Sequence, residues 1–400
     1  MTSQVQELLD GARAGRWILP SPKQPNPVSL VRAIADICGA TNGFNDPVAD
    51  SFRNLIGEPE HLVFVIADGF GMNFVNSLDK DSFSRSNLAI ECRAVFPSST
   101  GPNLFTYGRG QWPGQHGKLG WWVHLPVLGE RASLFPWQRT RDGKDLTELG
   151  LDGASVFPGE AFVVSFGRDV ANFIPDDLAG SVPTRALHGP DSINQYSGLS
   201  NAVDLVVERI DSADEPTYSH IYWPKIDSAA HGGGTTHEKT LGRVSELDSQ
   251  MQRLRELLPS NATLVITADH GHADAPRHLK FRIDPSDEMS QMLETEPAGE
   301  SRILYFRVKD GENKRFAELF RKRYGEYLFL FSFDEMVELE LLGPDGISDV
   351  TKERLGDFLA VAKGACSIEF CAEGQERMLL LESTHGGLTP DEMLVPVIIA

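Results

Sequence analysis

The chain has 400 residues, which is enough for one large domain with an insertion or for two domains. Its hydrophobic share of 41% and charged share of 24% are typical of a globular protein, and no apolar run approaches the roughly 20 residues of a membrane-spanning helix. The formal net charge of −20 argues against binding a nucleic-acid polymer, but a small anionic substrate remains compatible if local cations neutralise the site.

The N-terminal sequence MTSQVQELLDGARAGRW lacks the apolar centre and the small-residue cleavage site of a signal peptide. We therefore expect a cytoplasmic protein with no membrane partner. The four cysteines form no C-x-x-C pair, and in a reducing compartment we expect buried thiols rather than disulfides. They are Cys38, Cys92, Cys366 and Cys371.

The first two thirds of the chain alternate apolar strands with helical segments. We expect helices at 4–13, 27–38, 201–210 and 235–258, and strands at 61–68, 161–167, 218–223 and 262–269. This alternation predicts an α/β fold with a mostly parallel central sheet and helices on both faces. In such sheets, functional groups gather beyond the carboxyl ends of the strands.

The pattern changes after residue 272. Segments 302–308 and 327–332 are typical of strands, 314–325 of a helix, and 351–364 of further mixed structure. We expect an inserted α+β cap at 273–365 and a catalytic core formed by 1–272 and 366–400. The chain is predicted to return to the central sheet with 378–387 and to finish there with 395–400.

Four short segments that follow predicted strands carry residues suited to metal binding. The first, ADGFG (67–71), places Asp68 before a tight turn, although Asp-Gly alone more often only makes a turn. The second, IDSAAH (226–231), spaces Asp227 and His231 so that they share one face of a helix; a capping Asp beside an unrelated histidine is the alternative.

The other two segments are ADHGH (268–272) and STHGG (383–387). Asp269 and His270 follow an apolar run, and burying such an ionisable pair requires a compensating charge, which a metal cation would supply. The alternative is a loop exposed to water, in which no compensating charge is needed. His272 is interpreted as a structural or supporting residue rather than a ligand. His385 is weak evidence alone, but it becomes a plausible last ligand once the others are placed.

Between the first two segments lies AVFPSSTGPNLFTYGRGQWPGQHG (94–117). Its Thr100-Gly101-Pro102-Asn103 run, followed by Thr106, Gly110, Pro113 and His116-Gly117, resembles the alkaline phosphatase superfamily, in particular its type I phosphodiesterase/nucleotide pyrophosphatase branch. The superfamily's ordered set of site residues is complete in this chain: Asp68, Thr100, Asp227, His231, Asp269, His270 and His385. The resemblance covers 60–120, 218–275 and the last 25 residues.

The resemblance implies an alkaline-phosphatase-like fold and two divalent metal ions roughly 4 Å apart, with Zn²⁺ expected and Mn²⁺ as the alternative. By the family pattern, one ion is held by Asp227, His231 and His385, and the other by Asp68, Thr100, Asp269 and His270. Thr100 is implied to attack phosphorus and form a phosphothreonine intermediate. Asn103 is implied to donate to a phosphate oxygen, a turn residue after Pro102 being the alternative.

Several neighbouring residues are alternative candidates for the same roles. Ser98 and Ser99 compete with Thr100 as nucleophile, but only Thr100 has the required spacing to Pro102 and Asn103. Sulfatases carry Cys or Ser at the position of Thr100 and Arg at that of Leu104, which argues against sulfate esters. No arginine is identifiable as a phosphate ligand, Arg109 being a positional candidate only, and His116 is interpreted as a structural hydrogen-bonding residue.

The sequence thus predicts a metal-dependent hydrolase of phosphoric esters, namely a phosphodiesterase or nucleotide pyrophosphatase. Its partner would be a small phosphorylated substrate such as a nucleotide. The alternatives are a phosphomonoesterase or phosphonate hydrolase on the same site, or a non-catalytic, metal-stabilised protein that binds phosphorylated ligands. The intact Thr100 hydroxyl argues against the non-catalytic alternative. The segment 120–128, GWWVHLPVL, is either pocket lining or core.

Overall fold

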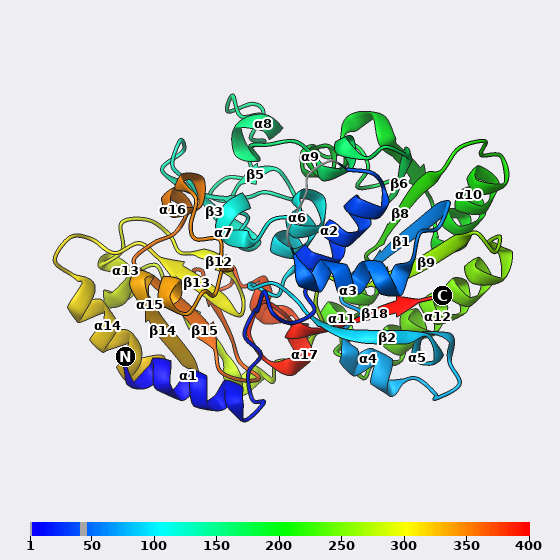
Figure 1. Cartoon of the computed structure of the whole chain (residues 1–400). Coiled ribbons are helices and arrows are strands. Elements are labelled where there is room, and N and C mark those ends of the chain that lie inside the picture. Colours follow the sequence, from blue (N-terminus) through cyan, green and yellow to red (C-terminus); the bar gives the residue numbers. More distant parts are fainter. Residues whose placement is uncertain (1, 41–45) are drawn as a thin grey trace.

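The computed structural model describes residues 2–40 and 46–400 and contains two large sheets (Figure 1). The first sheet has seven strands in the order β2 (Leu88–Arg93), β18 (Leu394–Ile399), β9 (Ala262–Thr267), β1 (His61–Ala67), β8 (Thr217–Trp223), β6 (Asp169–Pro175) and β7 (Ile193–Tyr196). The pairings from β9 to β7 are parallel, whereas β18 is antiparallel to both of its neighbours. The predicted mostly parallel α/β sheet is confirmed.

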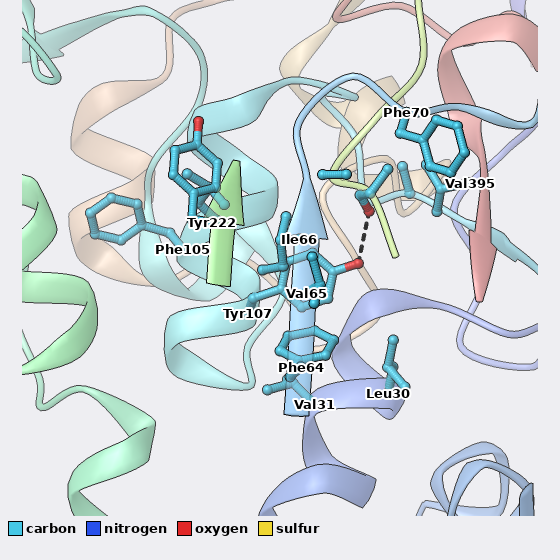
Figure 2. Packing of buried hydrophobic residues seen from close by; sticks show 14 of the residues in the cluster. Leu30, Val31, Phe64, Val65, Ile66, Phe70, Phe105, Tyr107, Tyr222 and Val395 are labelled. Carbon is cyan, nitrogen blue, oxygen red and sulfur yellow. Dashed lines mark hydrogen bonds between the residues drawn. The ribbon is translucent and has the colours of Figure 1, made fainter. Parts of the chain in front are cut away.

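Strand β1 lies at the centre of the first sheet and all seven of its residues are buried, so both faces are covered. Figure 2 shows Phe64 of β1 beside Leu30 and Val31, which belong to the helix α2 (Pro27–Ile37). Tyr107, from the helix α6 (Thr100–Arg109), meets Phe64 edge-on with ring centroids 5.7 Å apart. Full burial of each such side chain contributes about 1.5–3 kcal/mol, which makes β1 a rigid support for the residues that follow it.

The helices form groups around the first sheet. Helix α2 contacts α3 (Pro47–Ile56) and α6, while α10 (Leu199–Asp211) contacts α12 (Glu238–Leu257). The shorter helices near this sheet are α4 (Met72–Ser77), α5 (Phe83–Ser86), α7 (Pro113–His116), α8 (Gly153–Val156), α9 (Val182–His188), α11 (Lys225–Gly233) and α17 (Pro390–Met393). The helices predicted at 27–38, 201–210 and 235–258 correspond to α2, α10 and α12.

The second sheet is antiparallel and stands apart from the first (Figure 1). Its order is β14 (Leu328–Ser332), β15 (Phe358–Ala362), β13 (Ile303–Phe306), β12 (Ala298–Glu300), β3 (Trp122–Leu125), β4 (Glu130–Ser133) and β5 (Gln138–Arg139). Its helices are α1 (Ser3–Arg13), α13 (Glu288–Gln291), α14 (Asn313–Tyr324), α15 (Phe333–Glu338) and α16 (Asp349–Arg354).

The second sheet therefore joins strands from 298–362 to strands from 122–139, and helix α1 packs against its edge strand β14. Trp122 of the aromatic segment 120–128 is a buried residue of β3. The segment 122–139 thus reaches across to elements that follow residue 272. The division into a core (1–272 and 366–400) and a cap (273–365) remains a prediction about domain boundaries.

Two predicted strands are wrong. The segment 161–167 contains a 3-10 turn, Phe162–Ser165, because Phe162 and Phe166 pack on the same side with ring centroids 6.1 Å apart and Val164 faces solvent. The segment 378–387 does not rejoin the first sheet. The Glu369 carboxylate accepts hydrogen bonds from the backbone N–H groups of residues 377–379 and holds them in a turn, Met378–Leu380.

Two small ladders complete the structure. Strand β17 (Ser383–Thr384) pairs with β10 (Ala273–Asp274), and β11 (Lys280–Ile283) pairs with β16 (Ser367–Phe370). The β10–β17 ladder matters for function because it carries the segment with His385 back to the segment that follows Asp269. Within residues 2–40 and 46–400, no helix has the length and apolar character needed to cross a membrane.

Candidate active site

Three aspartates meet beyond the carboxyl ends of adjacent strands of the first sheet. Asp68 follows β1 directly, Asp269 lies just after β9, and Asp227 lies in the first turn of α11 after β8. The backbone joins them closely, because the N–H of Asp227 donates to the Asp68 carbonyl at 3.1 Å and the N–H of Gly69 donates to Asp269 Oδ1 at 3.0 Å. The expected gathering of acids at the strand ends is therefore present.

The glycine after Asp68 is required by this close approach. Gly69 has a φ of +76°, and a Cβ placed on it would lie 2.7 Å from His272 Nε2 and 3.0 Å from the Asp227 Cα. Any side chain at this position would both strain the backbone and push the loops apart. Gly69 therefore lets the β1 loop lie directly against the segments that carry Asp227 and His272.

Two buried carboxylates and a half-buried hydroxyl surround the buried His270 ring, and we refer to Asp68, Thr100, Asp269 and His270 as the inner group. His270 Nε2 lies 3.4 Å from Asp68 Oδ1, 3.5 Å from Asp269 Oδ2 and 3.1 Å from the Thr100 hydroxyl. His270 Nδ1 donates to the Gly271 carbonyl at 3.0 Å, so its Nε2 lone pair faces the carboxylates. Such an arrangement is repulsive without a cation or a proton between the partners.

A second group, which we call the outer group, consists of Asp227, His231 and His385. Asp227 Oδ1 lies 3.1 Å from His231 Nε2 and 3.5 Å from His385 Nε2. Asp227 and His231 share one face of α11, as their spacing predicted. His231 Nδ1 donates to the Ser383 carbonyl at 2.8 Å, which again directs the Nε2 atom toward a carboxylate.

His272 also contacts Asp227, with its Nε2 atom 3.0 Å from Asp227 Oδ1, while its Nδ1 atom lies 2.9 Å from the Ser383 hydroxyl. The sequence interpretation gave His272 only a structural or supporting role. Asp227, His270 and His272 nevertheless form a third set whose ligand atoms lie close enough to share one cation. The repeated histidine in ADHGH was the available signal for this proximity.

The electrostatics of the inner group disfavour ionising both of its acids, Asp68 and Asp269, without compensating charge. Burial raises the pKa of Asp68 well above its usual range, and the negative charges of Asp269 and Asp227 raise it further. Burial also raises the pKa of Asp269 to about 7, although the hydrogen bond from the Gly69 N–H acts to lower it. The inner group therefore has the character of a site that needs a cation to keep its acids ionised.

The outer group behaves differently because histidines surround its single acid. Burial acts to raise the pKa of Asp227, but the charge and hydrogen bonds of His231 and His272 outweigh burial and lower it. Burial lowers the pKa of His231, but the Asp227 carboxylate outweighs it and raises that pKa to about 9. Without a metal ion, the proton on His231 is the compensating positive charge.

The donor set fits divalent cations. Among the described residues, buried atoms without a hydrogen-bond partner include Asp68 Oδ1 and Asp269 Oδ2, both of which face His270 Nε2. Zinc and similar metals are typically bound by carboxylates and by histidines whose other ring nitrogen donates to a carbonyl oxygen. Asp68, Asp269 and His270 form one set of atoms close enough to share an ion, and Asp227, His231 and His385 form another.

Thr100 is the hydroxyl that enters the inner group. It is the first residue of α6, so its side chain and the free N–H groups of the first turn lie at the positive end of the helix. The competing Ser98 hydroxyl instead donates to the Gly387 carbonyl at 2.7 Å, and Ser99 is the N-cap residue of α6. The geometry therefore distinguishes Thr100 from its two neighbours.

The other candidates near Thr100 lie away from the inner group or are engaged elsewhere. Asn103 lies within α6, and its amide donates to the carbonyls of Ser99 at 3.0 Å and Pro97 at 3.3 Å. The implied role of Asn103 on phosphate stays a prediction. Arg109, at the far end of α6, donates to the Phe157 carbonyl.

His116 has the contacts of a structural residue. It lies 3.2 Å from the Thr106 hydroxyl through Nε2 and accepts the Lys118 N–H through Nδ1 at 3.2 Å. Burial lowers its pKa to about 3, so it stays neutral. These contacts agree with the hydrogen-bonding role expected from the sequence.

The chain matches the family model of type I phosphodiesterase / nucleotide pyrophosphatase over residues 62–387 and belongs to this family. It is therefore an enzyme, a hydrolase of the phosphodiesterase/nucleotide pyrophosphatase type. The family is metal-dependent, in agreement with the aspartate and histidine groups described above. No curated protein shows significant sequence similarity to the chain.

Solved structures with the same fold include the murine and human ectonucleotide pyrophosphatase / phosphodiesterase 5. Each is 16% identical, with 84% of this chain and 87% of the other chain covered, at TM-scores of 0.58 and 0.62. An inactive variant of the murine protein in complex with AMP matches with a TM-score of 0.59 at the same identity and coverage. At this identity the likeness concerns the fold.

Proposed function

We propose that the protein hydrolyses phosphodiester or pyrophosphate bonds of a small substrate, such as a nucleotide, through a phosphothreonine intermediate on Thr100. The observation that carries this proposal is the position of the Thr100 hydroxyl, 3.1 Å from His270 Nε2 and so within the inner group. A site used only for stability has no need of a hydroxyl there. The murine relative in complex with AMP supports a nucleotide as the substrate class.

In this proposal Asp68, Thr100, Asp269 and His270 hold one divalent ion, and Asp227, His231 and His385 hold the other. When bound, the ions supply Lewis-acid stabilisation of the reacting oxygens and make the threonine alkoxide accessible at neutral pH. The Gly271 and Ser383 carbonyls orient His270 and His231, respectively, so that the ligand nitrogens are already placed. Zn²⁺ is the ion we expect, with Mn²⁺ as the alternative.

The chemistry then proceeds by two displacements. The Thr100 hydroxyl loses its proton and its oxygen bonds to phosphorus, while the ester or anhydride oxygen leaves with the bonding electron pair and takes up a proton. Water next attacks phosphorus, the bond from Thr100 to phosphorus breaks, and the threonine hydroxyl is restored. One water is consumed per bond cleaved, and the N–H groups at the start of α6 orient the phosphoryl oxygens.

The replacement Thr100→Ala tests this proposal. We expect turnover of bis(p-nitrophenyl) phosphate with zinc or manganese to fall at least about 10³-fold, because the nucleophile is lost. Thr100→Ser is the matched control, since it keeps a hydroxyl and should retain part of the activity. Mass spectrometry of quenched wild-type enzyme should find phosphate on Thr100.

Comparing bis(p-nitrophenyl) phosphate with p-nitrophenyl phosphate separates a diesterase from the monoesterase alternative. A higher kcat/KM for the diester supports the proposal, and a clear preference for the monoester overturns the diesterase assignment. If Thr100→Ala keeps wild-type turnover, the phosphothreonine mechanism is wrong.

A further inference from the structure

Lys118 is a buried cation beside the nucleophile that the proposed mechanism has not used. Its side chain is fully buried, and its Nζ atom donates to the Gly120 carbonyl at 2.6 Å. A Cβ placed on Gly101 would lie 2.6 Å from Lys118 Cε and 3.3 Å from Nζ. Because Gly101 follows Thr100 directly, the ammonium group lies against the first turn of α6.

Glu300, the last residue of β12, brings the second sheet to the same place. Its carboxylate is buried, its Oε1 atom has no hydrogen-bond partner, and the Ser99 side chain faces it. Glu300 Oε2 lies 3.9 Å from His385 Nδ1, and a Cβ on Gly386 would lie 3.1 Å from Oε1. The Glu300 carboxylate therefore lies between Ser99 and the segment that carries His385.

Lys118 and Glu300 act on each other electrostatically, since each shifts the pKa of the other toward its charged form. An ammonium group has three donors; within the part of the chain that the structure describes, Lys118 Nζ donates one hydrogen bond, to the Gly120 carbonyl, and lies 5.0 Å from the centroid of the Phe135 ring. The remaining donors lie in a buried environment, where burial lowers the pKa of Lys118 to about 7. A buried cation with spare donors gains strongly from an anionic partner.

A phosphoryl group attacked by Thr100 presents non-bridging oxygens whose charge must be stabilised at the start of α6. Of the other candidates named above, Arg109 lies at the far end of α6, where its Nη2 donates to the Phe157 carbonyl, and the Asn103 amide donates to backbone carbonyls. Arg302 is bound by both oxygens of Glu392. The sequence offered no arginine for this role, and the structure places a lysine there.

We infer that Lys118 is the phosphate-binding cation of the site: its ammonium group binds a non-bridging oxygen of the phosphoryl group that Thr100 attacks, and Glu300 positions that ammonium group. The inference rests on the proposed function and identifies which side chain recognises the oxyanion. It also assigns the second sheet a direct contribution to the site, because Glu300 belongs to β12. The competing explanation is an ion pair that only stabilises the fold.

The test compares Lys118→Met with the wild type and with Lys363→Met. Lys363 is a matched control because its ammonium group lies over the Phe329 ring and pairs with Glu7, on the side of the second sheet that carries α1. The readouts are the dissociation constant of inorganic phosphate by calorimetry on zinc-loaded protein, kcat and KM for bis(p-nitrophenyl) phosphate, zinc content and the thermal midpoint.

We expect Lys118→Met to weaken phosphate binding at least about 10-fold and to lower kcat about 10²–10³-fold, with zinc content retained. Lys363→Met should leave the phosphate affinity and kcat at wild-type values. A folded, zinc-loaded Lys118→Met protein whose phosphate affinity stays within about threefold of the wild type overturns the inference.

If the single variant does not fold, the double variant Lys118→Met with Glu300→Gln leaves no unpaired buried charge and is measured in its place. The same thresholds apply to it. A failure of the proposed function can be distinguished from a failure of this inference. If the proposed function is wrong, the wild-type protein binds phosphate but hydrolyses no phosphodiester. The phosphate affinity of the Lys118→Met protein then still shows whether Lys118 binds the anion.

Discussion

The inner and outer groups of the site use the same residue types in opposite environments. The side chains of Asp269 and His270 are fully buried, whereas those of Asp227 and His231 are 15% and 22% exposed. The inner group crowds acids together and raises their pKa values, while the outer group surrounds one acid with histidines and lowers its pKa.

This difference assigns distinct tasks to the two groups. In the proposed mechanism the attacking oxygen lies in the inner group, where the buried environment strengthens its electrostatic stabilisation. Water and the leaving oxygen need access, and the partly exposed outer group provides it. The position of Thr100 within the inner group agrees with this division.

Removing one acid from each group should give the largest difference. We expect Asp269→Asn to weaken zinc binding by roughly 10²–10⁴-fold, equivalent to about 3–5 kcal/mol, because it breaks a buried charge pairing. Asp227→Asn should have a smaller effect, since solvent reaches the outer group. Competition with a zinc chelator measures both constants, and a larger loss for Asp227→Asn would contradict the contrast between the groups.

The pH dependence of zinc binding should differ between the groups. His231 has its pKa raised to about 9, so below that pH the metal must displace a proton, and affinity for the outer ion should rise with pH. Between pH 6 and 8 this corresponds to about 100-fold, at roughly tenfold per pH unit.

Asp269, with its pKa raised to about 7, must lose a proton below pH 7, and Asp68, whose pKa burial raises well above its usual range, must lose one as well. The affinity for the inner ion should therefore rise at least roughly tenfold over the same range, with up to two protons released on binding. Calorimetry in buffers of different ionisation enthalpy counts the released protons. Equal pH slopes for the two ions would show that the groups do not differ in protonation.

The smallest effect is expected at His272. Its Nε2 atom lies 3.0 Å from Asp227 Oδ1, so it orients the outer acid whether or not it contacts the ion. His272→Gln should lower zinc affinity by about 10–100-fold at the outer ion and leave the inner ion unchanged. His237→Gln, at the exposed N-cap position of α12, is the control, and a loss confined to the inner ion would count against this placement.

The strand ends of the first sheet could be predicted because their signals are local. Strand β1 is a nearly continuous apolar run, β8 and β9 are rich in apolar, aromatic and β-branched residues, and each leads directly into a segment that carries a site acid. Short or irregular elements gave no such signal. The strand predicted at 161–167 lies just before the true strand β6, and β12 has only three residues.

The residues added by the structure depend on long-range packing. Nothing in HGKLG shows that Lys118 is fully buried, because burial of a lysine depends on its partner, and Glu300 lies 182 positions further along the chain. The segment around 378–387 was misassigned for a different reason. The Glu369 carboxylate, only 8 to 10 positions earlier, binds the N–H groups of residues 377–379, and a pattern of apolar residues does not encode such a side-chain contact to the backbone.

The central claim is that two groups of side chains hold two divalent ions around one threonine. Anomalous scattering at the zinc edge from crystals of zinc-loaded protein tests it most directly. The account predicts two peaks, one bounded by Asp68, Asp269 and His270 and the other by Asp227, His231 and His385. A single peak, or peaks remote from Thr100, would contradict it.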